Sequence, residues 1–251
     1  MCGRYFLQRD PAGLRDYFGV PETNALPNFA PNWNMAPTQD GVVLRRNPET
    51  GDRQMDLLRW GLVPRWAKDA KGGARLMNAR ADGVAEKPSF RDAFAKRRCL
   101  VPADGFYEWL SPKEAEGTAR TKDPKQPSAV ALASGEPMAL AGIWEGWKDP
   151  EGHWLRTYSI ITTEANPKQA PLHHRMPVIL PREAWPAWLG ERETPVEELQ
   201  ELLRPCPPDW LACWPVSKRA NKVAENDAGL IVRDASVPAP PGLDDPSPYA
   251  V

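Results

Sequence analysis

The sequence has little of what metal-binding, disulfide-bonded or membrane-spanning proteins require. Its four cysteines, at positions 2, 99, 206 and 213, form no Cys-x-x-Cys pair, so neither a zinc site nor a disulfide framework is predicted. No apolar run approaches the ~20 residues that span a bilayer, and no signal-peptide segment is present. A net charge of −1 argues against indiscriminate binding to duplex DNA. We therefore expect a cytoplasmic protein that stays out of membranes and needs no metal or organic cofactor.

Prolines, tryptophans and local positive charge are abundant instead. The 251 residues include 29 prolines and 11 tryptophans, which predict ordered loops and flat apolar surfaces. Residues 59–98 hold eleven lysines and arginines against four acidic residues. Such a basic segment suits a groove for a polyanion, although an ordinary solvated face has the same pattern.

Alternating apolar residues separated by turn residues predict mainly strands. We expect strands at residues 42–45, 54–60, 99–101, 106–109, 138–147 and 154–162. Short helices are expected at 12–18, capped by Asp10, from a capping box that opens at Ser89, and after Thr194. Because turns join many successive strands, the pattern favours an α+β fold with a curved, largely antiparallel sheet and helices outside it.

The chain shows no linker that divides it, so we expect one domain over residues 1–235. Residues 111–128 are polar and rich in lysine and proline, and they are interpreted as a surface insertion loop. Residues 236–251 are proline-rich and are predicted to form a disordered C-terminal tail.

Cys2 directly follows the initiator methionine and is the most informative residue. A small second residue favours removal of Met1, which would leave an α-amine and a thiol on Cys2. Such an aminothiol condenses with an aldehyde to a Schiff base and then closes a thiazolidine ring. An α-amine, with a pKa of about 7.7–8.0, is partly neutral and nucleophilic near pH 7. The alternative is that Cys2 is simply a small buried residue or part of a ragged terminus.

Three further polar residues stand among aromatic or structure-breaking neighbours. On its predicted strand, Glu108 points away from Tyr107 and Trp109, and desolvation there would raise its pKa toward neutrality, as a proton carrier requires. His173 could protonate a leaving oxygen or a sugar oxygen. Asn78 could hydrogen-bond a reacting amine or sugar. An exposed strand glutamate and a surface histidine pair are the alternative interpretations.

Four segments together carry a specific resemblance: Cys2-Gly3-Arg4-Tyr5, Asn78-Ala79-Arg80-Ala81, Gly105-Phe106-Tyr107-Glu108-Trp109 and His173-His174-Arg175-Met176-Pro177. In this order they resemble the SOS-response-associated peptidase (SRAP) family, with similarity over roughly residues 2–233. The resemblance implies a curved, mainly antiparallel, barrel-like β core flanked by helices. It also implies capture of abasic sites in single-stranded DNA as a covalent protein–DNA crosslink, by a protein that we expect to be monomeric and nucleoid-associated when bound.

The resemblance also implies roles for individual residues. Catalytic roles fall to Cys2, Asn78, Glu108 and His173. Phosphate or base contacts fall to Arg4, Trp66, Arg80 and Arg175. His173, not His174, matches the family's histidine because it stands two residues before Arg-Met-Pro. His174 departs from the pattern, since relatives carry an aspartate there, and this puts the hydrogen-bond environment of His173 in question.

Two alternatives from other functional classes stay open. The Cys2 thiol could attack an amide with its own amine as the base, as in an N-terminal-nucleophile hydrolase or peptidase. That enzyme would cleave peptides without DNA. The basic segment and the tryptophans could instead form a noncovalent single-strand binding module, whose function Cys2→Ala would leave intact.

Overall fold

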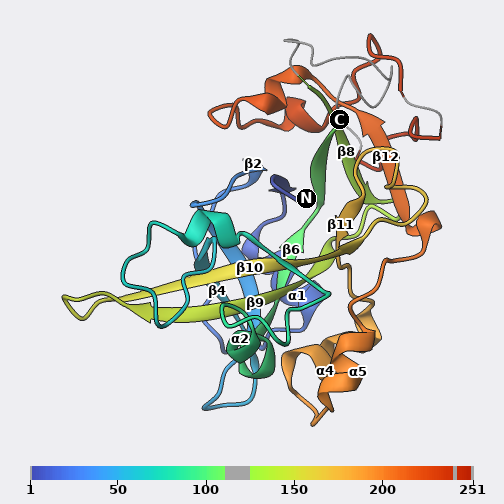
Figure 1. The fold of residues 1–251 in the computed structure, drawn as a ribbon. Helices are drawn as coiled ribbons and strands as arrows, with labels where there is room; N and C mark the ends of the chain where they lie inside the picture. The colour runs from blue at the N-terminus through green and yellow to red at the C-terminus, as the bar shows by residue number, and fades with distance from the viewer. Residues whose placement is uncertain (1, 111–124, 240–241, 250–251) are drawn as a thin grey trace.

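Two β-sheets form the body of the protein, and short helices lie at their periphery (Figure 1). The computed structural model describes residues 2–110, 125–239 and 242–249. The strands are β1 (Tyr5–Leu7), β2 (Asn32–Met35), β3 (Asp40–Arg46), β4 (Arg53–Trp60), β5 (Asn78–Arg80), β6 (Arg98–Ala103), β7 (Gly105–Leu110), β8 (Gln126–Leu132), β9 (Met138–Lys148), β10 (Trp154–Glu164), β11 (Arg175–Pro177) and β12 (Leu211–Pro215).

The helices of the described residues are all short. The α-helices are α1 (Pro11–Phe18), α2 (Arg91–Lys96), α4 (Trp185–Leu189) and α5 (Val196–Glu201). Single 3₁₀ turns are η1 (Gly73–Leu76), η2 (Arg182–Ala184), η3 (Pro208–Trp210), η4 (Lys218–Asn221) and η5 (Ala228–Ile231). None of these helices has the length and apolar character that crossing a bilayer requires.

The larger sheet closes on itself as a five-stranded barrel. Its strands follow the order β10, β4, β3, β6 and β9, and β9 pairs again with β10. All neighbours are antiparallel except β10 and β4, which run parallel through the pairs Thr157–Arg59 and Tyr158–Trp60. This closure confirms the expected curved, mainly antiparallel, barrel-like core flanked by helices.

The second sheet, in the order β12, β8, β7, β1 and β2, continues directly from the barrel. Only Asp104 separates β6 of the barrel from β7 of this sheet. A buried pair of hydroxyls ties the two sheets together, since Tyr5 Oη on β1 lies 2.7 Å from Tyr158 Oη on β10. The Tyr5 ring also packs on Trp60, with ring centroids 5.1 Å apart. These contacts fix the start of β1 against the barrel.

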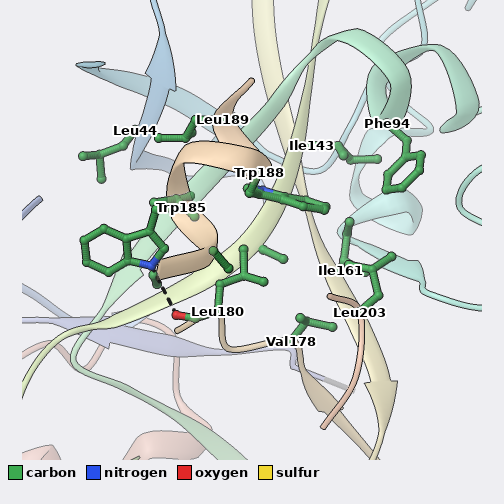
Figure 2. Packing of buried hydrophobic residues seen from close by; sticks show 14 of the residues in the cluster. Leu44, Phe94, Ile143, Ile161, Val178, Leu180, Trp185, Trp188, Leu189 and Leu203 are labelled. Atoms are coloured by element: carbon green, nitrogen blue, oxygen red, sulfur yellow. Dashed lines mark hydrogen bonds between the residues drawn. The ribbon is translucent and has the colours of Figure 1, made fainter. Parts of the chain in front are cut away.

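Short helices pack aromatic side chains against the barrel. Figure 2 shows Trp185 and Trp188 of α4 among apolar side chains of the barrel strands. Each indole also satisfies its N–H: Trp188 donates to the Cys99 carbonyl (2.8 Å), and Trp185 donates to the Leu180 carbonyl (3.2 Å). Burying such side chains contributes roughly 1.5–3 kcal/mol each, so this cluster anchors the helices to the barrel.

The predicted helix starts are confirmed in one case and corrected in another. Asp10 caps α1 by accepting the N–H groups of Ala12 and Gly13, as expected. The capping box predicted at Ser89 does not form, because Phe90 is the cap residue of α2 and has no side-chain hydrogen bond there. Phe90 is instead buried in the core. Apolar anchoring, rather than a polar cap, therefore sets the start of α2.

Two segments expected to lack regular structure pack against the second sheet. Residues 126–128, assigned to the insertion loop, instead begin β8, where Ser128 pairs with Glu108; the loop's residues 111–124 lie outside the described part. In the predicted disordered tail, Leu243 is buried and the Tyr249 hydroxyl donates to the Asp104 carbonyl (2.5 Å). These two apolar side chains anchor the described tail, against the expectation from its proline content.

Gly41 of β3 packs against the hydroxyl pair between the sheets, so a substitution there tests this packing. A Cβ atom there would lie 2.3 Å from Tyr158 Oη and 2.4 Å from Tyr5 Oη. We expect Gly41→Ala to cost about 1–3 kcal/mol of stability and to lower the melting temperature by several degrees in a thermal denaturation experiment. Adding Tyr158→Phe should restore part of the loss. Gly72→Ala, with no atom within 4 Å of the new Cβ, is the control; equal melting temperatures for the two alanine variants would contradict this packing.

Candidate functional site

Cys2 lies three residues before the start of β1 and is completely buried. β1 pairs with β7 so that Tyr5 stands opposite Phe106. Continued toward the N-terminus, this antiparallel register places Glu108 opposite Gly3, beside Cys2. Strand pairing therefore brings together two residues that are more than a hundred positions apart.

Glu108 is a buried carboxyl in the middle of β7. It is 3% exposed, and burial raises its pKa to about 7, although Lys125 opposes the shift. Tyr107 and Trp109 point to the other face of the strand, as the alternation predicts, with ring centroids 6.3 Å apart. A carboxyl that titrates near pH 7 can both donate and accept a proton under physiological conditions.

The Cys2 thiol lies in the apolar cluster between the two sheets. Burial raises its pKa well above the ordinary value, and the nearby Glu108 raises it further, while the backbone N–H of Arg4 opposes this. The thiol is therefore neutral at physiological pH. A thiol of this kind becomes a nucleophile only when a neighbouring group takes its proton.

Asn78 on β5 holds the backbone of Cys2. Its Nδ2 donates to the Cys2 carbonyl across 2.7 Å, which identifies Oδ1 as the acceptor atom of the amide. Among the residues that the structure describes, this buried Oδ1 finds no hydrogen-bond donor. Because buried acceptors are normally satisfied, Asn78 offers a place for an N–H or O–H group beside Cys2.

His173 is half-buried in the loop that leads into β11. Its Nδ1 accepts the backbone N–H of Arg175 (3.0 Å), so in the neutral ring the proton is on Nε2. The exposed His174 stacks on it, with ring centroids 4.3 Å apart and planes at 25°. The histidine that we expect to differ from the family pattern therefore stacks on His173.

A cleft of about 490 Å³ opens beside these groups. It is lined by Gly3, Arg4, Glu108, Trp109, Lys125, His173 and Asn221. Three of the predicted site residues, Arg4, Glu108 and His173, thus share one cleft. The Arg4 guanidinium lies over the Trp109 ring, 5.6 Å from its centroid, and donates to Asn34 Oδ1 across 2.8 Å.

Three residues of the cleft were missed at the level of sequence. Lys125 falls in the segment predicted to be an insertion loop. Asn221 accepts a hydrogen bond from Trp109 Nε1, but 112 positions separate the two residues, so no local pattern points to it. The aromatic run around Glu108 was the available signal for Trp109.

The other two predicted arginines line a separate groove of about 380 Å³. Arg80 is exposed, whereas Arg175 is buried and donates from Nη2 to the Thr162 carbonyl (2.7 Å) and Oγ1 (2.6 Å). Thr162 of β10 pairs with Arg80 on one side and with Pro177 on the other, so β5 and β11 lie on its two edges. His173, which lines the cleft, stands two residues before Arg175, which lines the groove, so the start of β11 borders both.

Trp66, the predicted base-stacking residue, is 66% exposed in the loop after β4. In the described part of the chain it is not among the residues that line the cleft. Its exposed ring leaves one face open to a ligand that approaches from solvent.

The raised pKa of Glu108 has a measurable effect on stability. Folding raises this pKa from 4.5 to about 7. The carboxyl therefore makes its full contribution to the stability of the folded state below about pH 4.5, and this contribution is lost as the pH rises through 7. The glutamine of Glu108→Gln does not titrate. We therefore expect the variant to gain about 3 kcal/mol relative to the parent protein between pH 4.5 and 8, measured by urea unfolding. Glu49→Gln, at an exposed glutamate, is the control. If the difference in unfolding free energy between Glu108→Gln and the parent protein changes with pH as little as the difference for the control, the burial argument is contradicted.

Comparisons with known proteins agree with one another. The family model described as SOS response associated peptidase (SRAP) matches residues 1–223. The chain is 38% identical over 233 residues to the abasic site processing protein YoqW of Bacillus subtilis, covering 92% of this chain and 99% of that one. It is 33% identical to the abasic site processing protein HMCES of Gallus gallus, covering 92% and 77% of the two chains.

Solved structures have the same fold. A protein from Bacteroides thetaiotaomicron matches with a TM-score of 0.78 at 23% identity, over 93% of this chain and 100% of that one. A protein from Bordetella bronchiseptica matches with a TM-score of 0.70 at 28% identity, over 86% and 100%. On the strength of the family match over nearly the whole length, this chain belongs to the SRAP family.

Proposed function

We propose that the protein processes abasic sites in single-stranded DNA by trapping them as a thiazolidine on Cys2, which protects the strand from cleavage. The observation that carries the proposal is that Glu108 and His173 line one cleft, while strand pairing brings Cys2 next to Glu108 and a hydrogen bond joins Asn78 to Cys2. The SRAP match and relatives named as abasic site processing proteins support the handling of abasic sites. The covalent chemistry rests on the geometry of these four residues.

The first step is attack of the Cys2 α-amine, freed by removal of Met1, on the aldehyde carbon of the open abasic sugar. His173 can assist ring opening, because its Nε2–H can donate to the sugar ring oxygen as the C1′–O4′ bond breaks. Asn78 Oδ1 can accept an N–H of the attacking amine and orient its lone pair. A C–N bond forms, and the amine proton passes to the former carbonyl oxygen.

Glu108 then drives the loss of water. Its protonated carboxyl donates to the departing hydroxyl, the C–O bond breaks, and an iminium remains between Cys2 and the sugar. A pKa of about 7 leaves a substantial protonated fraction at neutral pH. The resulting Glu108 carboxylate lies beside the iminium and stabilises its charge.

Ring closure uses the same carboxylate as a base. Glu108 takes the thiol proton, the sulfur attacks the iminium carbon, and the C=N electron pair returns to nitrogen. One C–N and one C–S bond have formed, and one water has left. Burial keeps the thiol neutral until this point, so it is spent on ring closure rather than on other electrophiles.

The DNA backbone is held by arginines. Arg4 lines the cleft, and Arg80 and Arg175 line the neighbouring groove, so they would contact phosphates near the abasic nucleotide. Trp66 offers an exposed ring for base stacking.

The hydrolase alternative asks the Cys2 thiol to act first. A nucleophilic thiol needs a lowered pKa or an immediate base, whereas burial and Glu108 raise the pKa of this thiol. The site therefore favours chemistry that begins at the amine and ends at the sulfur.

Separate variants of Cys2 can distinguish the amine from the thiol. Cys2→Ser keeps the α-amine but removes the sulfur, so we expect no stable adduct with an abasic oligonucleotide on a denaturing gel. Borohydride should still trap the Schiff base of this variant. The parent protein should give an adduct without borohydride. A stable adduct in Cys2→Ser would exclude the thiazolidine, and unchanged DNA protection in Cys2→Ala would favour the noncovalent module.

The rate of adduct formation should depend on pH through two groups. The reaction needs a neutral amine, with a pKa of about 7.7–8.0, and a protonated Glu108, with a pKa of about 7. We expect a bell-shaped profile with its maximum between pH 7 and 8 in quenched time courses. Glu108→Gln should react roughly 10²-fold more slowly and lose the alkaline decline. If the variant keeps that decline, Glu108 is not the acid.

A further inference from the structure

The arginine groove contains an acidic side chain that the proposed reaction does not use. Asp82 follows β5 and lines the groove together with Glu164 and three arginines, Arg80, Arg175 and Arg204. Arg204 and Arg80 are exposed, while Arg175 is buried. An anion that enters the groove therefore meets three positive charges and two carboxylates, and of these Asp82 is the one that contacts the arginines directly.

Asp82 occupies the binding edge of Arg80. Arg80 Nε donates to Asp82 Oδ1 (2.8 Å) and Nη2 donates to Oδ2 (2.5 Å), a two-pronged contact of the kind that a phosphate also makes with arginine. This interaction holds the pKa of Asp82 at about 2, so the carboxylate is charged at every physiological pH.

Asp82 also faces the second arginine. Its Oδ1 lies 3.9 Å from Nη1 of Arg175, whose position is fixed by two hydrogen bonds from Nη2 to Thr162. The Nε of Arg175 is buried and has no acceptor among the described residues. Arg175 therefore presents a fixed charge, and Asp82 is the partner that can turn into solvent, since its side chain is 62% exposed.

We propose that Asp82 is an internal substitute for phosphate, which occupies the groove in the free protein and is displaced by a backbone phosphate of the bound strand. The inference rests on the proposed function and adds to it a residue that lowers the affinity for DNA strands that make no other contacts. An exposed ion pair is weak enough to exchange, and a phosphodiester matches the same guanidinium edge. The displaced carboxylate repels the strand, so only a ligand with further contacts, such as those in the Cys2 cleft, remains bound.

The test is fluorescence anisotropy with an unmodified single-stranded oligonucleotide, measured over a range of salt concentrations. We expect Asp82→Asn to bind about fivefold more tightly than the parent protein at low salt. The slope of log affinity against log salt should steepen by up to about 0.7, because the carboxylate that the strand displaces in the parent protein takes up a cation and offsets one of those released from the DNA. Asp82→Glu, which keeps the internal charge, should retain the parent slope.

The control is Asp52→Asn, which makes the same change in net charge in the exposed turn between β3 and β4. Affinity and slope for Asp82→Asn equal to those of Asp52→Asn would overturn the proposal, and weaker binding would show that Asp82 orients Arg80 instead. Adduct formation with an abasic oligonucleotide is measured in parallel. A parent protein that binds the strand but forms no adduct would refute the crosslinking function and leave the role of Asp82 to be decided by anisotropy alone.

Discussion

The pairing of β1 with β7 is the interaction on which the site depends. β1 is three residues long, yet this strand of the second sheet is held against the barrel by the Tyr5–Tyr158 hydroxyl contact and by the Tyr5–Trp60 ring contact. Chain termini are usually loose and solvated. Here the second residue is completely buried, with its carbonyl bound by Asn78. The residue proposed to react is thereby held in a fixed position near the terminus.

Burial then determines how protons are distributed in the site. The same low-polarity surroundings raise the pKa of the Cys2 thiol and bring that of Glu108 to about 7. The thiol is thus protected, and the carboxyl is able to give and take a proton at neutral pH. The hydrogen bond from the Arg175 backbone to His173 fixes the donor nitrogen of that ring in the same way. These pKa values and the His173 tautomer follow from the fold and require no movement of the described residues.

Sequence patterns predicted six of the twelve described strands, β3, β4, β6, β7, β9 and β10, because these carry their own apolar pattern between turn residues, and missed β1, β2, β5, β8, β11 and β12. These patterns could not predict that the barrel closes, since closure depends on the parallel pairing of β10 with β4, in which Tyr158 and Trp60 are almost a hundred residues apart. At the site, its position after Met1 singled out Cys2, the family resemblance predicted roles for its partners, and β-strand alternation predicted the orientation of Glu108. Asn221 was out of reach because its role comes from a long-range contact. Composition was misleading at the tail, where two apolar side chains outweigh the prolines.

The central claim is that Cys2 becomes an N-terminal aminothiol and captures an aldehyde. Intact-protein mass spectrometry before and after incubation with a single-stranded oligonucleotide that carries one abasic site tests it most directly. The account predicts loss of Met1, followed by a gain equal to the mass of the oligonucleotide minus one water, and no gain with intact DNA. Loss of Met1 without an adduct at any pH near neutral would contradict it.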